Sequence, residues 1–152
     1  MVDNFTLFST MFEATGQEAV WLEHLWNAAG GLQEDNKFVC FSYELFGDQE
    51  AFLCNLRLNA VEAGKPVQVI LTCDENCCLE DVAKVLKCFL KHFERKDSII
   101  ISYAETCSKM RIDQFGGGIV LVTAEEYRIR DGHYLLEFVQ KEVSREIQSD
   151  PD

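Results

Sequence analysis

Thiol, carboxylate and glycine residues gather in one stretch of the chain, between two short apolar runs. Residues 98–104 and 118–123 are rich in β-branched side chains, which predicts two buried strands. Glu105 and Cys107 begin the polar segment that joins these strands, and three consecutive glycines end it. A connection of this length in a small domain is usually either functional or mobile, so it is the first place to look for a site.

Cys107 is a candidate nucleophile because residues of both charges stand near it in the loop, among them Glu105, Lys109 and Arg111. A cysteine enzyme needs a general base, usually histidine, to form the thiolate. Of the three histidines, His133 stands at the edge of a predicted element, at the start of the last helix. Cys107, His133 and Glu105 are thus the catalytic candidates, and the alternative is an unreactive loop thiol with a surface histidine.

Four thiols are candidate ligands for a metal ion. Cys73 ends a predicted strand, Cys77 and Cys78 follow it, and Cys107 ends the strand expected beside it. Four thiolates at tetrahedral distances hold zinc, but adjacent cysteines point in different directions and the sequence has no paired Cys-x2-Cys knuckles. The simpler interpretation makes Cys73 and Cys78 small, semi-buried side chains. The sequence therefore predicts no metal and no other cofactor.

The glycine run invites a ligand-binding hypothesis for Gly116, Gly117, Gly118 and Arg111. Phosphate-binding loops follow a strand and open a helix whose amino end faces the anion. These glycines instead precede a strand, and no P-loop lysine or serine follows them. We favour the alternative, which is close backbone approach or a bulge where the strand enters the sheet.

Trp21 lies outside the apolar stripe of the first predicted helix, between Glu18 and Glu23. An exposed tryptophan beside carboxylates would suit a protein-binding patch with an aromatic anchor. Large aromatic side chains are usually mostly buried, so we favour the alternative of a broad helix face that packs on the core.

Hydrophobic periodicity and turn residues predict the elements that position these side chains. The predicted strands are residues 5–13, 37–46, 67–73, 98–104, 118–123 and 127–130. The predicted helices lie between Thr15 and Gly30, from Asp48 to about Ala63, after the turn at residues 74–78, and after Gly132. Thr15 and Glu18 have the spacing of a capping box at the start of the first helix.

The strands at residues 67–73 and 98–104 flank a helix through short connections, which is the pattern of a βαβ unit. We expect these strands to be parallel neighbours with a right-handed crossover. Cys73, Glu105 and Cys107 would then meet at one sheet edge, where ligands bind in open α/β sheets. The predicted fold is one α/β domain over residues 1–148, with a mixed sheet, a central parallel βαβ unit and about four helices. Residues 149–152 form a frayed acidic tail.

The chain has 152 residues, 47% apolar and 26% charged, which fits one domain with its own core. Its 14 Lys and Arg against 26 Asp and Glu give a formal net charge of -12, which disfavours binding to nucleic acid or an anionic membrane. No apolar run approaches the ~20 residues of a membrane span, and the first residues lack a signal-peptide pattern. Seven cysteines, an odd number, indicate reduced thiols and a cytoplasmic location.

Two functional hypotheses from different classes follow. The first is a small acidic protein-interaction module, such as an inhibitor, immunity-type or accessory factor, that docks a basic partner through its carboxylates. The second is a ligand-binding protein or thiol-dependent enzyme with a site at the strand ends near Cys73, Cys107 and Gly116–Gly118. The first predicts binding that weakens with salt, and the second predicts a concave site with a cysteine of lowered pKa. Neither hypothesis fixes the oligomeric state.

Overall fold

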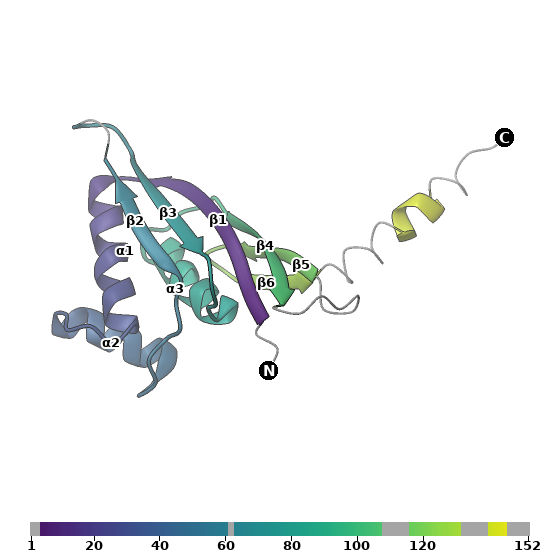
Figure 1. The fold of residues 1–152 in the computed structure, drawn as a ribbon. Helices are drawn as coiled ribbons and strands as arrows, with labels where there is room; N and C mark the ends of the chain where they lie inside the picture. Colours follow the sequence, from purple (N-terminus) through teal and green to yellow (C-terminus); the bar gives the residue numbers. More distant parts are fainter. Residues whose placement is uncertain (1–3, 61–62, 108–115, 132–139, 146–152) are drawn as a thin grey trace.

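Six strands form one sheet, and three helices cover one of its faces (Figure 1). The computed structural model describes residues 4–60, 63–107, 116–131 and 140–145. In chain order the elements are β1 (Asn4–Ala14), α1 (Gly16–Ala29), α2 (Asn36–Phe46), β2 (Asn55–Asn59), β3 (Val67–Cys73), α3 (Leu79–His92), β4 (Ile99–Cys107), β5 (Gly116–Val122) and β6 (Tyr127–Asp131).

The sheet has the order β2-β3-β1-β4-β5-β6, and every neighbouring pair is antiparallel. The prediction of a mixed sheet with a central parallel βαβ unit is therefore wrong. β3 and β4 do run in the same direction, but β1 lies between them: its residues 8–14 pair with β3 and its residues 4–7 pair with β4. Short connections through α3 place the two strands near each other, and they leave room for a third strand whose backbone hydrogen-bonds to both.

A second pair of strands is separated in the same way. β1 and β2 run in the same direction, and β3 lies between them. Two βαβ units are thus interleaved, which is the split arrangement called ferredoxin-like, and the β5–β6 hairpin extends it at the β4 edge. This topology hosts many unrelated functions, so it fixes where residues stand and leaves their chemistry open.

α1 begins and ends as the sequence predicts. The Glu18 backbone N–H donates to Thr15 Oγ1 at 3.1 Å, and the Thr15 N–H donates to Glu18 Oε1 at 2.8 Å, which completes the capping box. After Gly30, Gly31 adopts a φ of 89°, a left-handed conformation that glycine tolerates and that stops the helix. The buried stripe includes Leu22, as expected.

The segment predicted as a strand at residues 37–46 is the helix α2 instead. Phe38, Phe41 and Leu45 share one helix face at i, i+3 and i+7 and pack toward the core. Val39 and Tyr43, which share one face of the predicted strand, are exposed on the outer side of the helix. The apolar residues of this segment are compatible with the two-residue period of a strand and with the 3.6-residue period of a helix. Packing against α1 selects the helix.

The helix predicted for residues 48–63 is also wrong. Residues 47–54 have no regular structure and lead into β2, where inward and outward side chains alternate. Leu56 and Leu58 pack on the core, while Asn55, Arg57 and Asn59 are exposed. That alternation in Asn55–Asn59 is the period of a strand, and pairing with β3 supplies its hydrogen bonds.

The core lies between the sheet and the helices, and Phe89 of α3 stands near its centre. Its side chain is fully buried, and its ring lies 5.9 Å from that of Phe12 on β1 and 6.4 Å from that of Trp21 on α1. The guanidinium of Arg95 lies 5.4 Å from the Phe89 ring and binds Asp97 through two nitrogens. This cluster joins β1, α1 and the end of α3.

Residues 140–145 are helical and exposed, and the remainder of the predicted final helix lies outside the described residues. No helix in the described ranges is both long and apolar enough to cross a membrane.

Candidate functional site

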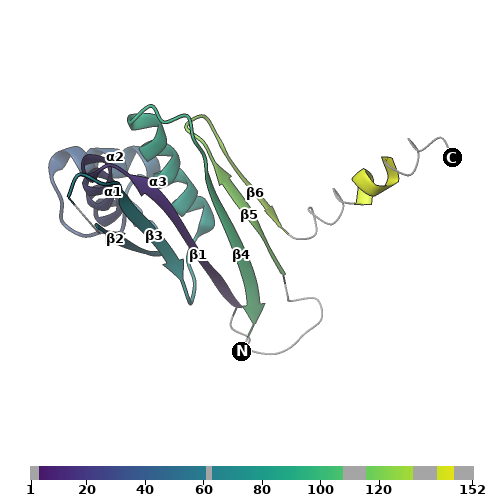
Figure 2. The ribbon, with the colours of Figure 1, turned by 90° about the horizontal axis from the view of Figure 1, so that it is seen from above.

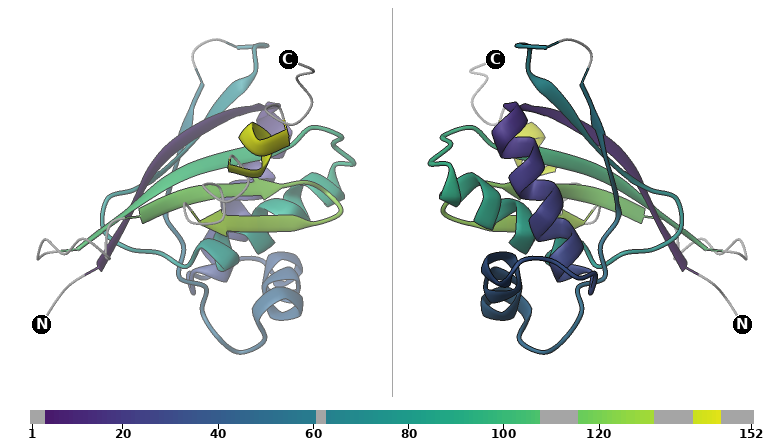
Figure 3. Two further views of the ribbon diagram at one scale, coloured as in Figure 1. Left: turned by 90° about the vertical axis from the view of Figure 1, so that its right-hand side faces the viewer. Right: turned by 90° about the vertical axis from the view of Figure 1, so that its left-hand side faces the viewer.

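The sheet has an open face that none of α1, α2 and α3 covers. Figure 2 shows the three helices on one side of the strands, and the two views of Figure 3 show the molecule from its helical side and from its sheet side. Apolar side chains on the open face are well exposed, at 57% for Met11, 54% for Ile100 and 37% for Leu121. An exposed apolar group of this kind on a folded chain is a candidate interaction surface.

Strand pairing aligns these side chains in one row. Ile70 stands opposite Met11 across β3 and β1, and Ile100 stands opposite Leu121 across β4 and β5. The pairing of β1 with β4 ends at Leu7 and Ala104, and its register, continued beyond that point, places Met11 opposite Ile100. The Thr10 hydroxyl donates to the Ile100 carbonyl at 3.0 Å and ties β1 to β4 at this level.

An arginine stands at each end of the row. Arg57 is the partner of Ile70 on β2, and Arg128 is the partner of Leu121 on β6. We call the six residues the cross-strand row: Arg57, Ile70, Met11, Ile100, Leu121 and Arg128. Strands are about 4.8 Å apart, so the four apolar members span about 14 Å and the arginine positions stand about 24 Å apart.

The open face differs in charge from the whole chain. Among the described strand residues, alternation places three arginines, Arg57, Arg128 and Arg130, and one carboxylate, Glu13, on this side. Arg128 contacts Glu126 at 3.2 Å, but both side chains are more than half exposed, so the pair is weak. A cationic, apolar face therefore occurs on a chain of formal net charge -12.

The thiol site predicted at the strand ends does not assemble, because its two strands are not neighbours. Cys73 pairs with Phe8, and Cys107 pairs with Asn4 four residues further along β1. Two strand spacings, about 10 Å, and four residues, about 13 Å, therefore separate the two cysteine backbones. The prediction that Cys73, Glu105 and Cys107 meet at one sheet edge is therefore wrong, because it required β3 and β4 to be parallel neighbours.

Cys73 instead meets two other thiols. Cys54, Cys73 and Cys77 are all buried, and the side chains of Cys73 and Cys77 are hydrogen-bonded. Burial raises the pKa of Cys54 to about 12, and the neighbouring Cys73 adds to the effect. Burial also raises the pKa of Cys77, so both thiols stay protonated and unreactive at neutral pH. Cys78 is half-buried at the start of α3. Within the described ranges, no group of three His, Cys, Asp or Glu side chains has a metal-binding arrangement.

The glycine run lets three strands approach closely. A Cβ on Gly117 would lie 2.5 Å from the Tyr103 carbonyl oxygen, and one on Gly118 would meet the Arg130 carbonyl oxygen. Burial raises the pKa of Tyr103, and the carboxylates of Glu105 and Asp131 raise it further. Close backbone approach, one of the two interpretations of this run, accounts for Gly117 and Gly118. Lys109, Arg111 and His133 lie outside the described residues, as does the side chain of Cys107.

Trp21 belongs to the core and is 7% exposed. Its ring stacks on His92 at 4.3 Å with an interplanar angle of 15°, and the edges of Phe38 and Phe41 meet it. Glu18 serves the cap of α1, and Glu23 is half-buried. The predicted patch of Trp21, Glu18 and Glu23 therefore has no exposed anchor.

Compared with protein-family models, curated proteins and solved structures, the chain matches none. The cross-strand row was missed in the sequence because its members come from six different strands and meet only through strand register. One signal was present: Arg57 and Arg128 stand at outward positions of short segments in which polar and apolar residues alternate.

Proposed function

We propose that this chain is a protein-interaction module that binds an acidic, amphipathic helix of a partner protein across the open face of its sheet. The observation that carries the proposal is the cross-strand row, in which four aligned apolar side chains end in an arginine on each side. Helix-in-groove recognition uses apolar anchors at i, i+3 or i+4, and i+7. Such a helix repeats every 5.4 Å, close to the 4.8 Å strand spacing, so successive turns meet successive strands.

The open face predicts an acidic partner, whereas the net charge of the chain alone predicts a basic one. A formal charge of -12 favours a basic partner, but the open face carries Arg57, Arg128 and Arg130. The arginine positions stand about 24 Å apart, the length of about 16 helical residues. A partner helix with carboxylates near both ends therefore complements the row in charge and in length.

The chain's own C-terminal region is a competing occupant. Its sequence carries apolar residues at helical spacing together with Glu137, Glu142 and Glu146. The described part of that region, residues 140–145, is exposed throughout and includes an exposed Val143. A cross-link from Ile100 distinguishes this occupant from a separate partner.

A photo-cross-linking amino acid at Ile100 tests the proposal in cells of the source organism. The expected product joins Ile100 to a different protein, within a segment that carries apolar residues at helical spacing and acidic residues at both ends. A cross-link to residues 132–152 of the same chain, to a second copy, or to no protein overturns the proposal. The same amino acid at Val20, which is exposed on α1, is the matched control and should not capture this protein.

An affinity measurement with the captured partner then tests the energetics. Ile100→Asp places a charge at the centre of the row and should weaken binding by about tenfold or more, since central apolar anchors dominate interfaces. Val20→Asp adds the same charge elsewhere and should leave the affinity within about twofold. Equal losses in both variants would show that net charge, and not the row, sets the affinity.

A basic partner is the second candidate, and one observation favours it. Val39 and Tyr43 are exposed one turn apart on the outer face of α2, beside Glu44. An aromatic anchor with acidic neighbours suits an inhibitor-like or accessory contact with a cationic protein. Tyr43→Ala should weaken that contact and leave the Ile100 cross-link unchanged.

A further inference from the structure

A groove of about 580 Å³ lies on the helical side of the molecule, where α2, α3 and β6 meet. Phe41 and Leu45 of α2 and Tyr127 of β6 give it an apolar and largely aromatic lining. All three side chains are half-buried, so part of each stays accessible to a ligand. This volume lies within the range of small-molecule sites, roughly 300–1,000 Å³.

Three lysines of α3 line the same groove. Lys84, Lys87 and Lys91 stand at i, i+3 and i+7 and therefore share one face of the helix. Among the described residues, none of the three forms an ion pair, and Glu44 is the one carboxylate in the lining. Lys84 Nζ also lies 5.9 Å from the centroid of the Phe46 ring. The groove thus focuses positive charge on an acidic protein.

His92 adds a fixed polar group beside Lys91. Its ring stacks on Trp21 at 4.3 Å and meets the edges of Phe41 and Phe93, which holds its orientation. Burial lowers the pKa of His92, and the charge of Lys37 lowers it further. A neutral imidazole at pH 7 offers one donor and one acceptor to a ligand.

We propose that this groove binds a phosphate monoester carried on a flat aromatic body. Lysine ammonium groups bind phosphate as point charges, and the three of them can contact one phosphate from adjacent turns. The aromatic body then lies against Phe41 and Tyr127, where ring faces interact favourably at offset or edge-on geometry. Each half of the ligand matches a different part of the lining, so neither half alone should bind well.

Three probes separate these contributions on the full chain: 1-naphthyl phosphate, 1-naphthol and inorganic phosphate. Binding is measured by calorimetry. We expect 1-naphthyl phosphate to bind about tenfold or more tightly than either other probe. Equal affinity for inorganic phosphate would reduce the groove to a nonspecific cationic surface, and equal affinity for 1-naphthol would remove any role for the lysines. Either result overturns the proposal.

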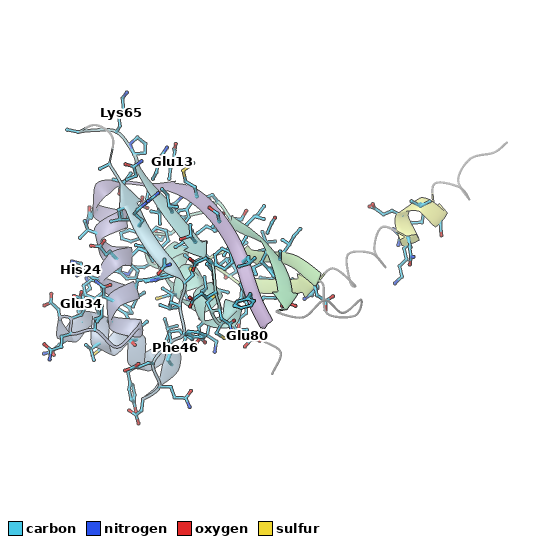
Figure 4. All side chains as sticks on the ribbon, viewed as in Figure 1. Glu13, His24, Glu34, Phe46, Lys65 and Glu80 are labelled. Atoms are coloured by element: carbon cyan, nitrogen blue, oxygen red, sulfur yellow. The ribbon has the colours of Figure 1, made fainter. Side chains whose placement is uncertain are left out.

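A charge-matched pair of double variants locates the site. Lys84→Gln with Lys87→Gln should weaken 1-naphthyl phosphate by about tenfold or more, because two phosphate-facing charges are lost. Lys65→Gln with Lys96→Gln removes the same charge outside the groove. Figure 4 shows Lys65 and Phe46 at opposite ends of the molecule. The control should change the affinity by less than about threefold.

Two further readouts keep the outcome decisive. Unfolding temperatures of both double variants should match the parent, since Lys84 and Lys87 form no ion pair with a described residue and Lys65 and Lys96 are exposed. Ile100→Asp on the opposite face should leave 1-naphthyl phosphate binding unchanged, so failure of the docking proposal and failure of this one are distinguishable. Equal losses in the two lysine pairs overturn the groove as the binding site.

Discussion

The open face of the sheet and the lysine groove are both cationic regions of an acidic chain, and they are built in different ways. The cross-strand row takes one residue from each of six strands, and strand register brings them together. The groove takes its three lysines from a single helix, at spacings visible in the sequence. Strand register therefore creates the cross-strand row, and helical periodicity creates the row of lysines in the groove.

This difference sets the shape of what each region can bind. A row of side chains on a sheet is long and shallow, which suits an extended contact with a helix. The groove between packed helices and a strand is concave, which suits a small molecule. The two regions share a core, so each can be perturbed separately only through residues that the core does not use.

Phe89→Ala should have the largest effect and should break both regions together. The fully buried ring packs against Phe12 of β1 and Trp21 of α1, so its loss leaves a cavity beneath both surfaces. The free energy of unfolding in urea should fall by about 3–5 kcal/mol. Phe52→Ala, at an exposed phenylalanine, should cost less than about 1 kcal/mol. A small effect at Phe89 would show that the regions do not depend on one core.

The adjacent pair Ile100 and Ile101 should separate the two faces of β4. Ile101 is fully buried and Ile100 is 54% exposed, although the residues are chemically identical. Ile101→Ala should lower the free energy of unfolding by about 2–5 kcal/mol, and Ile100→Ala by less than about 1 kcal/mol. Urea unfolding curves of the two variants and the parent measure both free-energy changes. Equal costs would mean that another part of the chain covers the open face in solution.

His92 should give the smallest effect, a pH dependence confined to the groove. Lys37 acts on its charge, and Glu44, Lys84, Lys87 and Lys91 line the same groove; its pKa in the free protein lies below the ordinary value of 6.5. A bound anion favours the imidazolium and raises that pKa, so affinity should rise as the pH falls through this range.

The pH effect is measured with 1-naphthyl sulfate, whose charge does not change in this range. Affinity should increase by about twofold to fivefold from about pH 7.5 to about pH 5.5. His92→Gln should abolish the increase, while His24→Gln on α1 should keep it. An increase that survives His92→Gln would assign the titration to another group. Ile100→Asp should leave the profile unchanged, which sharpens the separation of the two regions.

Sequence predicted the elements whose signals are local. The capping box of Thr15 and Glu18 set the start of α1, and the apolar stripe that includes Val82 and Phe89 predicted α3. The strands at residues 67–73 and 98–104 were also predicted near their observed bounds. Each of these signals depends on residues within a few positions of one another.

Sequence failed where packing chose between two periods or where distant segments met. Phe41 and Leu45 would share one face of a strand as well as one face of a helix, and contact with α1 decides between the two periods. The position of β1 between β3 and β4 has no local signature in the sequence. The prediction of a thiol site at the ends of β3 and β4 was wrong for this reason. The row on the open face depends on the same register, and one residue of slip would turn Met11 to the core.

The buried thiols of Cys54, Cys73 and Cys77 carry a consequence for how the protein survives heating. They come from three separate segments, and burial keeps all three out of reach of oxidants and raises the pKa of Cys54 and Cys77. Unfolding frees all three at once, with ordinary acidity, in a chain that has four more cysteines. In air, we expect the exposed thiols of unfolded chains to form mismatched disulfides, so thermal denaturation should be reversible in the presence of a reductant and less so without one.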